Sequence, residues 1–151
     1  MNFFCLLTAL VIFCISFPAC QRQDQTALPE RRASASTNSH RDDEKIAQAF
    51  RTQTSGVTVE SIGTVDKILA DDNKGSRHQR FIVRLSTGQT LLIAHNIDVA
   101  ARVPNLKVGD TVVFHGQYEW NPEGGAVHWT HHDPHGSHPG GFIEHQGRRY
   151  Q

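Results

Sequence analysis

Short runs of alternating apolar and polar residues, separated by turn residues, constrain the fold of this chain more than any other feature. Phe81, Val83 and Leu85 recur at every second position, and runs of the same kind follow. A spacing of two is typical of strands that bury one face and expose the other. Turn-forming residues, such as those at 86–89 and 121–125, separate the runs. The pattern predicts an all-β domain.

The order of these runs predicts a five-stranded, OB-like Greek-key barrel with a minor helical part. The first run is long, and we expect it to bend in a bulge at Gly63, where Ile62 falls out of phase. Residues 98–102 are expected to form a short helix between the third and fourth strands, as in OB folds. A small barrel of the SH3-like kind is the alternative.

Segments of a different character are expected on either side of the barrel. Asp42 and Asp43 are candidate caps of a short N-terminal helix, in which Ile46 and Phe50 lie four residues apart. The C-terminal tail over 133–151 is rich in His, Gly and Pro, and it is predicted to be irregular.

The first 19 residues carry no charged side chain and predict a signal peptide. Their apolar run is short for a membrane-spanning helix. After cleavage, Cys20 would stand at the new N-terminus, where it is a candidate for lipid attachment. A polar, flexible tether over 20–41 then leads to the domain at 42–151. We therefore expect an exported protein of the periplasm or cell envelope, which contacts the membrane only through the signal or a lipid anchor.

A polar surface is expected where the second and third strands meet at one end of the barrel. If the turn between them is centred on Thr87 and Gly88, then His95 lies opposite Arg80. OB folds commonly bind ligands on this face and in the neighbouring loops. A solvated basic loop without a ligand is the alternative. The candidate ligand-binding residues are Arg77, His78, Gln79, Arg80, His95 and Asn96.

A cluster of imidazoles near the C-terminus is a candidate metal site. Imidazole suits divalent transition metals such as zinc, copper and nickel. Because alternate residues of a strand face opposite sides, the cluster converges only if the chain turns near residue 133. Turn capping by the aspartate and adventitious binding by a His-rich tail are the alternatives. The candidate ligands are His131, His132, Asp133 and His135, with His138 and, opposite residues 130 or 131, His115 as further candidates.

The balanced net charge and the absence of known catalytic motifs limit the classes of function that we expect. Lys and Arg number 15 and balance 15 Asp and Glu, so nucleic acid is not an expected partner. The chain has no HExxH, GxSxG or P-loop motif, which favours binding over catalysis.

The leading hypothesis is an exported binding module for a small ligand or an anion, with a divalent metal such as zinc as the candidate cofactor. A metal-dependent phosphoester hydrolase is one alternative, in which Arg77 or Arg80 stabilises developing negative charge. A structural adaptor of the cell envelope is the other alternative.

Two sequence blocks carry a resemblance to a known family. They are GSRHQ at 75–79 and WTHHDP at 129–134. With them, residues 44–151 resemble a family of small bacterial proteins that is defined only as a domain of unknown function. The resemblance implies a small, often exported protein compatible with an OB-like barrel, and it implies no activity, cofactor or substrate.

Overall fold

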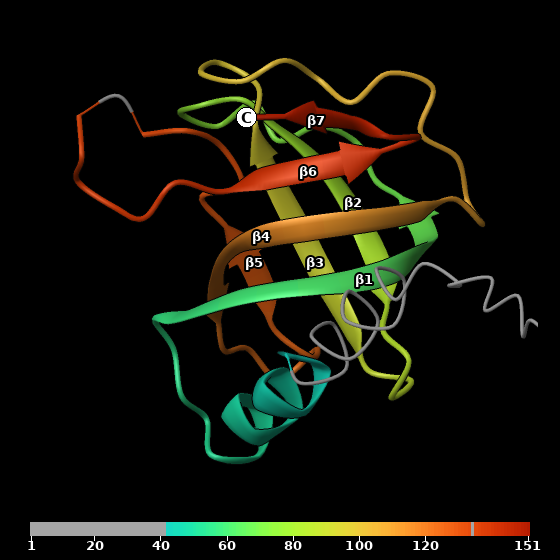
Figure 1. The fold of residues 1–151 in the computed structure, drawn as a ribbon, viewed down its shortest axis with the longest axis vertical. Helices are drawn as coiled ribbons and strands as arrows, with labels where there is room; N and C mark the ends of the chain where they lie inside the picture. The colour runs from blue at the N-terminus through green and yellow to red at the C-terminus, as the bar shows by residue number, and fades with distance from the viewer. Residues whose placement is uncertain (1–41, 134) are drawn as a thin grey trace, which may run out of the picture.

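The computed structural model describes residues 42–133 and 135–151 (Figure 1). The predicted signal peptide, the tether and Cys20 lie outside the described residues. No helix in the described part of the chain is long and apolar enough to cross a membrane. One helix, over residues 42–51, precedes the strands β1 (Val57–Ile68), β2 (His78–Arg84), β3 (Thr90–Asn96), β4 (Thr111–Glu119), β5 (Ala126–His128), β6 (Phe142–His145) and β7 (Arg148–Tyr150).

Strands β1 to β5 close into a barrel. Their order is β1-β2-β3-β5-β4, and β4 pairs with β1 to complete the circle. The β3–β5 pair is parallel, and the other barrel pairs are antiparallel. A five-stranded barrel of this kind is typical of the OB fold. The predicted all-β, OB-like architecture is therefore confirmed.

Side chains that alternate along the strands fill the barrel interior. Burial of these apolar groups is the main stabilising contribution to such a fold. The side chain of Ile46 belongs to the same core cluster, which joins the helix to the barrel. The largest fully buried side chains include Tyr118, Phe81, Phe114, Leu91 and Ile93.

The irregularity in β1 lies further along the strand than predicted. Ile62 keeps the alternation of the strand and is 45% exposed, while Gly63 faces inward. The pairing with β2 shifts between Val65 and Lys67 instead. Gly63 has a different role, because a Cβ at this position would lie 2.9 Å from the Cβ of Val83. Glycine is needed there because the two strands approach closely.

The prediction of a short helix over 98–102 is wrong. After β3 the chain makes a turn at 97–100 and continues through further turns to β4. Arg77 and Gln79, from the β2 region, hold the segment after β3 in these turns. Arg77 donates from its backbone N–H and its Nε to the carboxylate of Asp98, and the Gln79 amide bonds both the N–H and the carbonyl of Val103. Backbone groups that a helix would pair internally thus find side-chain partners.

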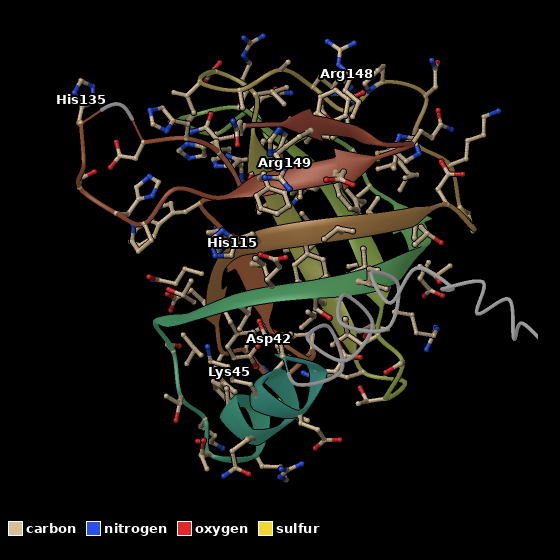
Figure 2. The ribbon with its side chains drawn as sticks, in the orientation of Figure 1. Asp42, Lys45, His115, His135, Arg148 and Arg149 are labelled. Atoms are coloured by element: carbon tan, nitrogen blue, oxygen red, sulfur yellow. The ribbon has the colours of Figure 1, made fainter. Side chains whose placement is uncertain are left out.

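The C-terminal tail is ordered over its last part, where an irregular segment was predicted. Strands β6 and β7 form a hairpin that pairs with β4 and buries Tyr150. In this pairing His115 lies opposite Phe142, and not opposite residues 130–131 as predicted. The Arg149 guanidinium lies 3.6 Å from the centroid of the Phe142 ring (Figure 2). Strands this short carry too few residues for alternation to be recognised.

The helix over 42–51 lies across one end of the barrel (Figure 1). Its two aspartates, predicted as caps, accept hydrogen bonds from the barrel. Asp42 accepts from the backbone N–H of Glu60 at 2.6 Å. The buried carboxylate of Asp43 accepts from the hydroxyls of Ser61 and Ser86. Both carboxylates therefore attach the helix to the barrel.

Candidate functional site

A pocket of about 380 Å³ lies on the outer face of the sheet at one end of the barrel. His78 of β2, Asn96 of β3 and His128 of β5 contribute to its lining. Because neighbouring residues of a strand face opposite sides, these side chains point away from the core. The pocket thus joins strands that are distant in the sequence.

The predicted register of the β2–β3 hairpin is wrong by one residue. The strands pair His78 with Asn96, and they place His95 opposite Gln79 rather than Arg80. A shift of one residue exchanges the two faces of a strand. Asn96 consequently lines the pocket beside His78, whereas His95 is buried beside Gln79.

Both ring nitrogens of His95 are hydrogen-bonded in the interior. Nδ1 lies 2.9 Å from the Thr130 hydroxyl oxygen, and Nε2 lies 3.1 Å from the carbonyl oxygen of Ala101. A carbonyl only accepts, so Nε2 carries the proton and Nδ1 accepts from the hydroxyl. Burial is the main cause that lowers the pKa of His95. His95 therefore supports the fold as a neutral side chain.

The two arginines of the predicted ligand face are engaged away from the pocket. The Nε of Arg77 lies 2.7 Å from a carboxylate oxygen of Asp98. The Nε of Arg80 donates to the carbonyl of Ala70 at 3.0 Å. The lining, as far as the structure describes it, contains no guanidinium.

Of the four predicted metal ligands, His131 is the one found in the described lining of the pocket. His132 and His135 are exposed, and His135 stands at the outer end of its loop (Figure 2). The Asp133 carboxylate accepts hydrogen bonds from two backbone N–H groups and a hydroxyl of the same loop. These bonds, the backbone ones foremost, hold the pKa of Asp133 well below its usual range. Among the described residues, no three His, Cys, Asp or Glu side chains are already arranged around one ion.

Residues 129–133 and 135–141, here called the strap, connect β5 to β6 and form one wall of the pocket. Trp129 begins the strap with a φ of +52°, in the left-handed region. Its indole stacks on the His138 imidazole, with ring centroids 4.4 Å apart. The His138 ring meets His131 nearly at a right angle, at 5.0 Å. The three rings form one packed unit at the edge of the pocket.

The pocket also contains residues that sequence reasoning did not assign to a ligand site. Gln117 and His128 are partners in the β4–β5 pair, and Glu119 lies on the same face. The amide of Gln117 donates to the Glu119 carboxylate at 2.6 Å. Burial lowers the pKa of His128, and the charge of Glu119 opposes this shift. The β4–β5 hairpin pattern alone would have grouped these three residues, but their approach to His78 depends on the parallel pairing of β5 with β3.

Three imidazoles of the lining have the same ring nitrogen fixed by the backbone. In His78, His131 and His138, Nδ1 lies 2.7 to 2.9 Å from a backbone carbonyl oxygen. Since the carbonyl only accepts, Nδ1 bears the proton, and Nε2 of the neutral ring keeps its lone pair. With the Glu119 carboxylate, the pocket is rich in electron-pair donors.

Residues 31–151 match a family described as a protein of unknown function, DUF3465. The chain belongs to this family. The matched part contains the described helix and the whole barrel, together with the pocket. No curated protein matches the chain. Membership in DUF3465 assigns no activity, so the function has to be argued from the atoms of the pocket.

Because His95 is buried, we predict that the free energy of unfolding decreases at mildly acidic pH. The pKa of His95 is lowered in the folded state, while an unfolded histidine titrates near 6.5. Below about pH 6.5 the unfolded chain therefore binds more protons, and stability falls by up to about 1.4 kcal/mol per pH unit for this residue. Urea unfolding from pH 7.5 to 5, in buffer with EDTA, should show this slope. The free energy of unfolding of His95→Gln should depend less steeply on pH. An equal slope in the variant and the unmodified chain would contradict the assignment of His95 as a buried, neutral histidine.

Proposed function

We propose that the chain is an exported OB-fold binding module that takes a small, positively charged ligand in the pocket beside the strap. One observation carries the proposal: the described lining offers imidazole lone pairs and one carboxylate, and it includes no Lys or Arg. Electron-pair donors of this kind attract cations. Export rests on the uncharged stretch of the first 19 residues.

The size and place of the pocket support binding of a small ligand. Its volume of about 380 Å³ lies within the range of roughly 300–1,000 Å³ that is usual for small-molecule sites. OB barrels commonly bind ligands on the strand faces and loops of this region. The alternatives of an anion and of a phosphoester substrate have less support, because Arg77 and Arg80 are bonded elsewhere.

A thermal-shift experiment tests the proposal. The probes are chloride salts of Zn²⁺, Cu²⁺, Ni²⁺ and Mg²⁺ and the organic amines spermidine and ethanolamine. At least one probe should raise the Tm saturably, because a ligand of the folded state stabilises it by mass action. Ser76→Trp, which fills the pocket from its exposed rim, should abolish that rise.

Lys74→Trp provides the matched control, because Lys74 lies in the same loop and outside the described lining. This variant should respond to the probes as the unmodified chain does. If no probe shifts the Tm, or if Ser76→Trp and Lys74→Trp respond equally, the pocket is not the binding site and the proposal fails.

A further inference from the structure

We infer that the ligand is a divalent transition-metal ion of the zinc or copper type, held by His78, His128 and His131. The inference rests on the proposed function and names the chemical class of its ligand. The three imidazoles come from β2, from the end of β5 and from the strap, and all three line the same pocket. Imidazole nitrogen is a preferred ligand of zinc, copper and nickel. The set shares only His131 with the ligands expected from the sequence.

The ring orientation of two ligands supports a metal. The Nδ1–H of His78 donates to a backbone carbonyl at 2.7 Å, and that of His131 does so at 2.9 Å. Metal-binding histidines typically donate their second ring nitrogen to a carbonyl or carboxylate, which selects the tautomer and orients the ring. In both residues this leaves Nε2 as the ligand atom. The backbone thus supplies the outer hydrogen bonds that a metal site requires.

A carboxylate is placed beside these imidazoles. Glu119 lines the pocket, and Gln117 orients it through the hydrogen bond of 2.6 Å. The negative charge favours a cation at short range. Three imidazoles with a water or a carboxylate make a four-coordinate set of the kind that zinc accepts. The volume of the pocket exceeds what one ion fills, so a coordination position stays open to solvent or to a second ligand.

Binding requires the rings to converge, since no three such side chains in the described residues already surround one point. Convergence therefore requires a rearrangement of these side chains, including that of His131 on the strap. His138 is assigned a positioning role: its ring packs between Trp129 and His131, and its Nε2 lies 3.9 Å from a carboxylate oxygen of Asp133. We therefore expect His138 to orient His131 rather than to hold the ion.

Metal titration of the untagged full-length chain, purified without metal-affinity resin and stripped with EDTA, tests the inference. Elemental analysis should find one zinc per chain, and competition with a chromophoric chelator gives the Kd. Loss of a partner in the outer shell of a metal site weakens binding by about 10- to 100-fold, so His78→Ala, His128→Ala and His131→Ala should each weaken it by about 100-fold or more. His138→Ala should have a smaller effect. Cobalt substitution adds a visible absorption band that reports the coordination, and His78→Gln should remove it.

His132→Ala and His135→Ala are the matched controls, because both residues are exposed histidines of the same strap. Their zinc affinity should equal that of the unmodified chain. Loss of binding in these two variants, with retention in His78→Ala and His128→Ala, would show binding by surface histidines and overturn the inference. Circular dichroism in EDTA checks that each variant folds, and His78→Gln repeats the test at a half-buried position.

The two proposals fail in different ways. A rise in Tm with spermidine or ethanolamine and none with any metal would keep the binding module and reject the metal. A response to no probe would reject both. Zinc binding that survives Ser76→Trp but is lost in His132→Ala would place the ion on the strap surface and also reject both.

Discussion

Replacement of His95 by alanine is expected to lower the free energy of unfolding by about 3 kcal/mol or more. The side chain is 0% exposed, and both of its nitrogens are hydrogen-bonded. Alanine would leave a cavity in the barrel and would remove the partner of the wholly buried Thr130 hydroxyl. Cavities and unsatisfied buried polar groups are among the causes of large destabilisation by core substitutions. Urea unfolding monitored by circular dichroism at pH 7.5 measures the change.

Two further variants separate the causes. His95→Phe fills the space with a slightly larger apolar ring and loses both hydrogen bonds, so it should recover part of the loss and remain less stable than the unmodified chain. His135→Ala removes an exposed imidazole and should change the free energy by no more than about 0.5 kcal/mol. If His95→Ala were as stable as His135→Ala, then His95 would not be a structural residue, and its place in the predicted ligand set would have to be reconsidered.

The barrel was predictable because its strands alternate over several residues, as at Phe81, Val83 and Leu85. The errors fall where local patterns compete with distant contacts. Residues 98–102 look helical in isolation, yet Gln79 binds Val103 and holds the segment in turns. Strands β6 and β7 are too short to show a period, and their pairing with β4 determines their conformation.

The candidate site shows how a small error in register changes an interpretation. The six residues predicted on the β2–β3 face were chosen by their polarity. The shift of one residue places Asn96 beside His78 in the pocket lining and His95 inside the barrel beside the buried Gln79. Sequence reasoning also could not assign His128 to the same pocket as His78, because only the parallel pairing of β3 with β5 brings the end of β5 close to β2.

Gly141→Ala is expected to destabilise the fold by about 3 kcal/mol, or to displace the strap. A Cβ at Gly141 would collide with the backbone carbonyl oxygens of Trp129 and His115 and would lie 3.0 Å from the Cα of Thr130. Backbone atoms cannot rotate away as a flexible side chain does. The Gly141 N–H also donates to the His131 carbonyl at 2.8 Å, so movement here would break a bond that holds the strap. Urea unfolding and hydrogen exchange over residues 129–141 measure the two outcomes.

Gly140→Ala is a matched control at the adjacent position. Its Cβ would meet only atoms of His132, the nearer at 3.9 Å, which is ordinary contact. We expect a change within about 1 kcal/mol, because the same substitution without strain mainly restricts the unfolded chain. Equal stability and equal exchange in the two variants would show that the strap does not approach β4 as closely as the structure indicates.

The same pair of variants connects the strap to the pocket. The side chain added at Gly141 is directed at backbone atoms of His115, Trp129 and Thr130, and Gly141 is not part of the described lining. A displaced strap would nevertheless carry His131 away from His78 and His128. Gly141→Ala should therefore weaken zinc binding while Gly140→Ala leaves it unchanged. Undiminished zinc binding in a Gly141→Ala chain with a displaced strap would mean that His131 is not a ligand, and the metal would then depend on β2 and β5 alone.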